Sequence, residues 1–303
     1  MQPFEVKILG CSSATPTSSR HPTSQIITFH EKFFLLDCGE ATQIQLRRYK
    51  IKIQRIDHIF ISHLHGDHYL GLPGLLGTMH LLGREKEVHI YSPPGLKEII
   101  DINSYHSKTF FKYKLVYHII SEESARIFEN NKLTVDTIPM NHRIPCYGFL
   151  FREKPLPRNI ITEKINQYFI PLQKIPEIKS GKNFTTNDGV IIPNSELTTA
   201  PPTPRSYGYC SDTIFNQSYI QQIQNVDLLY HEATFANDLI DRAKETHHCT
   251  TNEAGLIAKN AKVKKLIIGH FSARYNDLDI LLNETKKVFE NTSLAIEGES
   301  FII

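Results

Sequence analysis

The sequence predicts an α/β fold in which two β-sheets pack against each other and helices cover their outer faces. Short β-rich segments alternate with segments of helical apolar spacing, and this mixed order runs twice along the chain. The chain has 303 residues, enough for a large core, and its even composition suits one large domain or two fused halves.

The first pass opens with three β-rich segments that turn residues separate, which predicts a meander of strands. Further helical segments, one ending near Gly83 and one following Pro93-Pro94, then alternate with strands. The strands of this pass are expected at residues 4–9, 25–29, 33–37, 88–91, 115–120, 125–128, 133–138 and 147–151. The helices are expected at residues 40–49, 70–82 and 95–104.

The second pass begins at Tyr207 and repeats the alternation without a detectable sequence repeat. Its strands are expected at residues 207–210, 228–231, 266–268 and 294–296. Its helices are expected at residues 235–244, 251–260 and from 278 onward. Two such passes predict two packed sheets with helices on the outside.

Charge and cysteine content exclude several classes of protein. The net charge of +2 is too small for a surface that binds nucleic acid everywhere, so any RNA-binding surface must be local. The five cysteines are never spaced as Cys-x-x-Cys, which argues against a disulfide framework or a thiolate zinc site. The first residues lack the basic start and apolar core of a secretory signal. We therefore expect a soluble, cytoplasmic protein with no membrane partner.

Residues 152–204 separate the two passes and do not resemble core. This segment carries eight prolines, and only residues 162–168 have convincing helical spacing. Basic side chains outnumber acidic ones, and Tyr168, Phe169 and Phe184 add aromatic rings. Such a segment is expected to project as an arm that grips a nucleic-acid backbone, although a solvated insertion or a dimerisation strap fits the same composition. The basic residues are Arg152, Lys154, Arg158, Lys164, Lys174, Lys179 and Lys182.

Four side chains that can bind a metal lie within six residues, directly after the apolar run at residues 58–62. They are His63, His65, Asp67 and His68. Imidazole nitrogens and carboxylate oxygens suit Zn²⁺ or a similar ion, and so tight a loop can direct some ligands to one ion and the rest to a neighbour. The loop therefore predicts a two-metal hydrolytic site, against the alternative of a polar surface turn.

Three further candidate ligands, His142, Asp212 and His270, each follow an apolar run. A single His or Asp in such a place is more often part of a capped turn than a metal ligand. Together with the loop, however, the three supply the imidazoles and the bridging carboxylate that two adjacent ions require. We therefore predict two Zn²⁺ per chain.

The six residues from His63 to His68 read His-x-His-x-Asp-His, and this motif resembles that of the metallo-β-lactamase superfamily. Four other segments are similar to motifs of the ribonuclease Z family, and the similarity runs from Phe4 to the closing strand. These segments are FFLLDCGEATQ at residues 33–43, GLPGLLGTM at 71–79, HEATF at 231–235 and HFSARY at 270–275.

The resemblance implies a metallo-β-lactamase αβ/βα four-layer sandwich. Residues 1–151 and 205–303 would form the catalytic domain, with residues 152–204 inserted as a flexible tRNA-binding arm. It also implies a zinc-dependent endoribonuclease that cuts precursor tRNA after the discriminator nucleotide and works as a homodimer. Two departures concern the substrate: the family's Gly-Pro arm element is not evident around residues 170–173, and residues 16–21 match its Pro-x-Lys-x-Arg-Asn loop only partly.

The ligands divide into two sets when roles are assigned from their chemistry. One ion is expected to bind His63, His65 and His142. The other is expected to bind Asp67, His68 and His270, with Asp212 bridging the two. Adjacent ions lower the proton affinity of a shared water, which then attacks phosphorus, and Asp67 is expected to orient that water.

The resemblance also implies a proton donor for the leaving oxygen. His248 lies where the family carries a catalytic histidine, and Glu232 is expected to orient its imidazole. His247 is an adjacent competitor for the same role. Purely structural roles are the alternative, with Glu232 supporting a metal ligand and His248 lying beside a helix cap.

Two other functions remain open from the sequence. The first is a different hydrolase of the same superfamily, such as a small phosphodiesterase or a thioester hydrolase, against which the arm and the segments from Asp212 to His270 argue. The second is a tRNA-binding protein without catalysis. The complete set of expected ligands argues against it.

Overall fold

In a computed structural model, which describes residues 3–120 and 124–303, the chain divides into two compact units. The larger unit holds residues 1–128, 135–151 and 206–303, and the smaller unit holds residues 129–134 and 152–205. Met1 and Gln2, at the start of the first expected domain, lie outside the described residues. Over the described ranges no helix combines the length and apolar character needed to cross a membrane.

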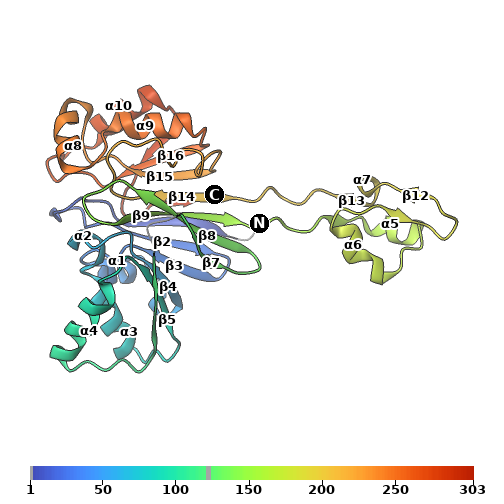
Figure 1. The fold of residues 1–303 in the computed structure, drawn as a ribbon, viewed down its shortest axis with the longest axis horizontal. Helices are drawn as coiled ribbons and strands as arrows, with labels where there is room; N and C mark the ends of the chain where they lie inside the picture. The colour runs from blue at the N-terminus through green and yellow to red at the C-terminus, as the bar shows by residue number, and fades with distance from the viewer. Residues whose placement is uncertain (1–2, 121–123) are drawn as a thin grey trace. The chain divides into compact units, whose positions relative to one another are not determined.

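The larger unit is built around two seven-stranded sheets that pack face to face (Figure 1). In the first sheet the order is β18 (Ser300–Ile302), β1 (Phe4–Gly10), β2 (Ser24–Phe29), β3 (Lys32–Leu36), β4 (Ile56–Phe60), β5 (Val88–Ser92) and β6 (Leu115–Ile119). In the second sheet it is β17 (Thr292–Leu294), β16 (Lys265–Gly269), β15 (Leu228–Glu232), β14 (Ser206–Cys210), β9 (Cys146–Glu153), β8 (Leu133–Met140) and β7 (Arg126–Glu129).

Helices cover the outer face of each sheet, which confirms the predicted four layers (Figure 1). The first sheet carries α1 (Thr42–Arg48), η1 (Ile53–Arg55), α2 (Gly66–Tyr69), α3 (Leu72–Leu81) and α4 (Leu96–Ser107). The second sheet carries η3 (Asn237–Leu239), α8 (Ile240–Thr246), α9 (Thr251–Asn260) and α10 (Asp279–Val288).

Two apolar layers hold this unit together. The fully buried face of α3 repeats at helical spacing, through Leu72, Leu75 and Met79, and packs on the first sheet. Between the sheets the core is aromatic, because the ring of Phe60 lies 5.3 Å from that of Phe149 on the opposite sheet. Burial of such rings removes a large apolar area from water.

Strand direction explains why the predicted ligands meet. Strands β3, β4 and β5 run parallel to one another in the first sheet, and β14, β15 and β16 run parallel in the second. In each group the carboxyl ends lie at one edge, so the loops that follow them come together there. Six of the seven candidate ligands lie in these loops, and His142 follows β8.

Two expected elements differ from those observed. The helix predicted at residues 235–244 begins later, because the carbonyl of Phe235 accepts a hydrogen bond from Thr251 N at 2.9 Å instead of starting the helix. The closing strand ends at Leu294, and the additional strand β18 pairs with β1. The next helix, by contrast, matches its prediction, since Thr250 and Glu253 form a capping box at its start.

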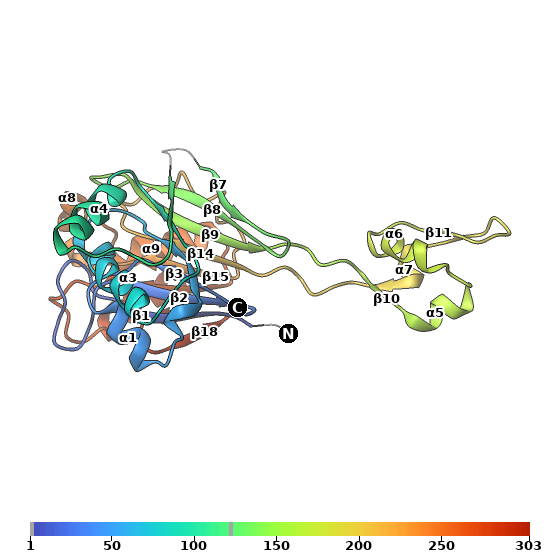
Figure 2. The same cartoon turned by 90° about the horizontal axis from the view of Figure 1, so that it is seen from below.

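The smaller unit has a fold of its own rather than a single helix. Figure 2 shows its short elements, which surround a buried apolar cluster. The cluster contains Ile170, Ile178, Phe184, Ile192 and Leu197. The elements are β10 (Asn159–Ile160), α5 (Thr162–Gln167), η2 (Leu172–Lys174), α6 (Ile175–Lys179), β11 (Phe184–Thr185), β12 (Ile191–Ile192), α7 (Asn194–Leu197) and β13 (Thr198–Thr199).

This cluster changes the interpretation of the aromatic residues in the segment. Phe184 is buried in the cluster and is not available to a ligand, whereas Phe169 is 89% exposed. The side chain of Tyr168 forms a hydrogen bond to Glu196 within the unit. Only Phe169 therefore keeps the expected character of an open aromatic side chain.

Candidate metal centre

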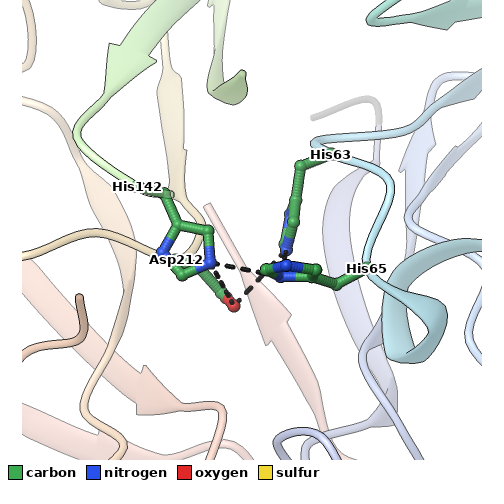
Figure 3. A group of neighbouring side chains, drawn as sticks. All are labelled: His63, His65, His142 and Asp212. Atoms are coloured by element: carbon green, nitrogen blue, oxygen red, sulfur yellow. Dashed lines mark hydrogen bonds and ion pairs between the residues drawn. The ribbon is translucent and has the colours of Figure 1, made fainter. Parts of the chain in front are cut away.

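The structure brings all seven predicted metal ligands together at the edge where the parallel strands end. The loop after β4 and the start of α2 provide His63, His65, Asp67 and His68. The loops after β8, β14 and β16 provide His142, Asp212 and His270 respectively. Figure 3 shows His63, His65, His142 and Asp212 pointing toward one another.

The first set is compact. Ligand atoms of its four members, His63, His65, His142 and Asp212, all lie within 4.8 Å of one another. The Nδ1 atom of His65 lies 3.1 Å from Nε2 of His63 and 3.2 Å from Nε2 of His142. Oδ2 of Asp212 lies 3.5 Å from Nε2 of His63.

The second set lies against the other oxygen of the same carboxylate. Oδ1 of Asp212 is 3.2 Å from Nε2 of His270 and 3.4 Å from Nε2 of His68. Oδ2 of Asp67 is 3.3 Å from Nε2 of His270 and 3.4 Å from Nε2 of His68. Asp212 therefore has one oxygen toward each set, as a bridging ligand requires.

The outer nitrogen of four of the five ligand histidines is held by a neighbouring acceptor, which fixes the role of the inner nitrogen. Nδ1 of His68 donates to the carboxylate of Asp37 at 2.8 Å, and Nδ1 of His142 donates to the carbonyl of His247 at 2.9 Å. A neutral ring that donates through Nδ1 presents Nε2 as an acceptor. Hydrogen bonds of this kind orient metal-binding histidines in proteins.

His270 and His63 follow the same pattern through hydroxyl groups. The Thr234 hydroxyl donates to Glu232 at 2.7 Å, so it accepts from Nδ1 of His270 at 2.9 Å. The Ser62 hydroxyl donates to Asp37 at 2.9 Å and accepts from Nδ1 of His63 at 3.0 Å. The inner nitrogens of both rings are therefore acceptors as well.

The centre consequently collects acceptor atoms that have no donor between them. Nε2 of His68 and Nε2 of His270 face each other at 3.3 Å, with carboxylate oxygens on either side. Oδ1 of Asp212 is buried and accepts no hydrogen bond from any described residue. Cations between these atoms would satisfy them, and nitrogen and carboxylate oxygen together suit Zn²⁺. The residues therefore fit a metal centre.

The charge state of the centre agrees with this interpretation. Burial disfavours a charged Asp212 carboxylate, but His270, His68 and His63 together hold its pKa well below the usual value. His68 is also buried, yet Asp212, Asp67 and Asp37 raise its pKa well above that of a free histidine. A proton on His68 would be released when a metal ion binds, as is general for metal ligands.

Glu232 and His248 lie together at the margin of the centre. Nδ1 of His248 is 3.0 Å from Oε1 of Glu232 and 4.0 Å from Oδ2 of Asp212. Burial lowers the pKa of His248, but the carboxylates of Glu232 and Asp212 outweigh burial and raise it to about 9. Within the described part of the chain, the buried Nδ1 atom of His247 has no hydrogen-bond partner, so the geometry favours His248 as the histidine that Glu232 orients.

Glycine allows the loops of the centre to pack closely. A Cβ atom on Gly71 would lie 2.1 Å from the carbonyl oxygen of Gly39, and one on Gly39 would lie 2.5 Å from that of Asp67. Because real Cβ atoms cannot approach backbone so closely, a larger residue at either position would displace the metal loop. The absence of a side chain at these two glycines therefore allows the loops to approach each other closely.

The sequence did not predict the residues that orient the ligands. Asp37 accepts hydrogen bonds from Ser62 N at 2.7 Å and from the Tyr209 hydroxyl at 2.5 Å, in addition to its bond with His68. Thr234 links Glu232 to His270. Asp37 ends a predicted strand and Thr234 lies three residues beyond another, so their position after a strand was the only signal in the sequence.

Comparisons with known proteins agree with the fold. Ribonuclease Z from Bacteroides thetaiotaomicron is 49% identical over 300 residues, covering 98% of this chain and 95% of that protein. Ribonuclease Z from Bacteroides fragilis is 48% identical, covering 98% of both. Residues 4–160 match the family model described as Anti-Pycsar protein Apyc1, a match that ends before Asp212, His248 and His270.

Solved structures give the same class of fold. The short form of human tRNase Z superposes with a TM-score of 0.71 at 25% identity, covering 98% of each chain. The metallo-β-lactamase fold protein YhfI from Bacillus subtilis superposes with a TM-score of 0.70 at 20% identity, covering 100% of each chain. The two packed sheets and the histidine-rich centre define a metallo-β-lactamase fold hydrolase.

Within that class, the full-length identity to its relatives settles the family. The chain belongs to the ribonuclease Z family.

Proposed function

We propose that the protein is a zinc-dependent endoribonuclease that removes the 3′ trailer of precursor tRNA by hydrolysing the phosphodiester bond after the discriminator nucleotide. One observation carries this function. The two oxygens of Asp212 face two separate sets of ligands, beside a histidine that Glu232 holds at 3.0 Å. Relatives named ribonuclease Z and tRNase Z support RNA, and tRNA in particular, as the substrate.

The metals are proposed to be two Zn²⁺ ions per chain. His63, His65 and His142 would hold one ion, and Asp67 with His68 and His270 would hold the other, with Asp212 shared. Bound in this way, the ions supply Lewis-acid activation of water and neutralise charge that develops on the phosphate.

The remaining steps belong to the side chains around the metals. Asp67 is held by a hydrogen bond from Ala14 N to its Oδ2 at 2.7 Å, which fixes the carboxylate that would orient the attacking water. His248 would donate a proton to the leaving 3′-oxygen, because its raised pKa keeps the imidazole protonated at neutral pH. Glu232 holds that imidazole in place.

The direct test is incubation with a 3′-extended precursor tRNA, with the cut mapped at nucleotide resolution. We expect a single cut after the discriminator nucleotide, leaving a 3′-hydroxyl group on the tRNA, and complete loss of activity when a chelator removes the metal. The same tRNA without a trailer is the control. Cleavage elsewhere, or cleavage that survives the chelator, would refute the proposed reaction.

The protein is further proposed to act as a homodimer in the cytoplasm. Helices on the outer face of the first sheet expose several large apolar side chains, which is the character of a surface that another chain covers. These residues are Leu81, Ile102 and Tyr105.

We also propose that residues 152–204 form a tRNA-binding arm. Charge alone supports this only modestly, because seven basic minus five acidic residues leave a net charge of +2. Several of these charges pair within the unit, as Lys164 does with Glu196 at 3.3 Å. Two neighbouring apolar side chains, Phe169 at 89% and Leu172 at 75%, are instead largely exposed. An exposed aromatic ring such as that of Phe169 can stack on a nucleobase.

Removing the arm should separate substrate binding from chemistry. Replacing residues 158–199 with a short Gly-Ser linker removes β10 together with its partner β13. We expect unchanged metal content and unchanged hydrolysis of a small activated phosphodiester, but binding of precursor tRNA weaker by about tenfold or more, or about 1.4 kcal/mol. Filter binding and single-turnover cleavage measure both effects.

A point variant provides a finer comparison for the arm. Phe169→Ala should weaken tRNA binding in the intact arm, while Phe184→Ala would damage the arm by removing part of its core. If the linker variant binds and cuts precursor tRNA as the parent does, the arm does not bind tRNA. If it becomes monomeric instead, the segment is a dimerisation strap.

A further inference from the structure

A basic surface lies on the larger unit, far along the chain from the arm. Residues 47–55 contain five basic side chains and no acidic one, and all five are exposed. None of the five forms an ion pair with another described residue. These five residues, which we call the basic surface, are Arg47, Arg48, Lys50, Lys52 and Arg55.

Helix stability explains only part of this charge. Arg47 and Arg48 lie in the last turn of α1, where cations interact favourably with the helix dipole. Lys50 and Lys52 lie beyond the helix and gain nothing from it. Exposed like charges repel one another, and a cluster of them is the usual footprint of a polyanion-binding surface.

Two hollows adjoin the basic surface. The first, of about 470 Å³, is lined by basic residues that include Arg47, Lys50 and Lys52. The second, of about 430 Å³, is lined by Arg48, Tyr49 and Arg20, among others. The second hollow combines basic side chains with the ring of Tyr49, and this combination suits single-stranded nucleic acid.

Arg20 supplies an independent indication of an anion in the second hollow. Its side chain is only 8% exposed, it forms no ion pair with a described carboxylate, and its Nε atom has no hydrogen-bond partner. A buried charge without a counter-ion is costly. Glu297 also lines this hollow, but His21 and Gln45 already donate to its carboxylate at 2.8 Å and 2.7 Å.

The second hollow is connected to the metal centre through Arg20. Nη2 of Arg20 donates to the carbonyl of Ser272 at 3.4 Å, two residues beyond His270. The loop that carries Arg20 also contacts the centre, because Ala14 N donates to Asp67. Arg20 therefore lies between the metal ligands and the hollow that Arg48 of the basic surface also lines.

We propose that the single-stranded 3′ trailer of the precursor RNA leaves the metal centre past Arg20 and lies on the basic surface, with phosphates near Arg48 and Lys50. This inference rests on the proposed function and names where that substrate is bound downstream of the cut. Tyr49 provides an aromatic side chain beside the phosphates.

The test compares two matched double variants. Arg47→Gln with Arg48→Gln removes two charges from the last turn of α1, and Lys286→Gln with Lys287→Gln removes two from the last turn of α10. Each variant binds and cuts precursor tRNA that carries either a minimal trailer or one of about 10 nucleotides, within the span that a single-strand groove covers. Binding of the trailer RNA alone, as a labelled oligonucleotide, is measured in parallel.

We expect the α1 variant to lose the extra affinity that a long trailer provides, and to bind the free oligonucleotide with a salt slope lower by about 1.4, or about 0.7 for each lost phosphate contact. Minimal-trailer cleavage and the α10 variant should match the parent. If the α1 variant loses the same affinity with both trailers, the basic surface binds the duplex stem. If it loses no affinity with either trailer, the basic surface has no role in RNA binding. Either result overturns the proposal. If the parent binds the oligonucleotide but does not cut precursor tRNA, the proposed function fails instead.

Discussion

Replacing Asp212 with alanine is expected to lower turnover at least as much as the loss of a catalytic proton donor, about 10²–10⁴-fold or more. The variant should also lose affinity for both metal ions. The reason is geometric, since Oδ2 of Asp212 faces His63 at 3.5 Å and Oδ1 faces His270 at 3.2 Å. Removing one side chain therefore removes a ligand from both sets.

Elemental analysis after equilibration with zinc measures this effect. The parent should hold close to two equivalents per chain, and His65→Ala should lose about one, because His65 contacts only the first set. Asp227→Ala is the control, since this carboxylate accepts a hydrogen bond from Ser206 N at 2.8 Å away from the centre. A folded Asp212→Ala protein that still holds two equivalents would show that the carboxylate does not bridge metals.

The ligands could be predicted because each follows an apolar strand in the sequence. His63, Asp212 and His270 lie within three residues of the end of a largely buried strand. Parallel strands end at a common edge, so a polar residue after each strand is placed near the others by topology alone. At these positions the sequence pattern around each ligand therefore predicts where the ligand lies in the folded protein.

The residues that orient the ligands could not be recognised in the same way. Asp37 matters because it meets Ser62, Tyr209 and His68, which come from three separate parts of the chain. In the sequence it is one more polar residue at the end of a strand. Its role depends on tertiary neighbours that no local pattern specifies.

The core of the smaller unit also could not be predicted from the sequence, because it too depends on tertiary neighbours. Ile178, Phe184 and Ile192 are isolated apolar residues among prolines and polar residues, without helical or alternating spacing. They form a cluster only because turns bring them together. The edge strand β18 was missed as well, since it pairs with β1 from the opposite end of the chain.

His248→Ala should lose about 10²–10⁴-fold in turnover while keeping both metals, which distinguishes it from the Asp212 variant. His248 donates to Glu232 at 3.0 Å and is not a member of either proposed ligand set. Removing it takes away a proton donor and leaves the metal ligands in place. Metal content and single-turnover cleavage of precursor tRNA measure the two properties separately.

His247→Ala is the matched control for this variant. The contribution of His247 to the centre is its backbone carbonyl, which accepts from His142 at 2.9 Å and which alanine retains. The control should therefore cut precursor tRNA at close to the parental rate. The opposite result, with His247→Ala inactive and His248→Ala active, would transfer the proton-donor role to His247.

The pH dependence tests the same assignment by a different property. A proton donor acts only while protonated, and the pKa of His248 is raised to about 9, mainly because Glu232 outweighs the effect of burial. Turnover in the parent should therefore fall as the pH rises through the pKa of this group, which bound cations next to Asp212 would shift to a lower value. In His248→Ala this alkaline decrease should disappear, because the residual reaction no longer uses the imidazole. A decrease that persists unchanged in the variant would assign it to another group and remove His248 from the proton transfer.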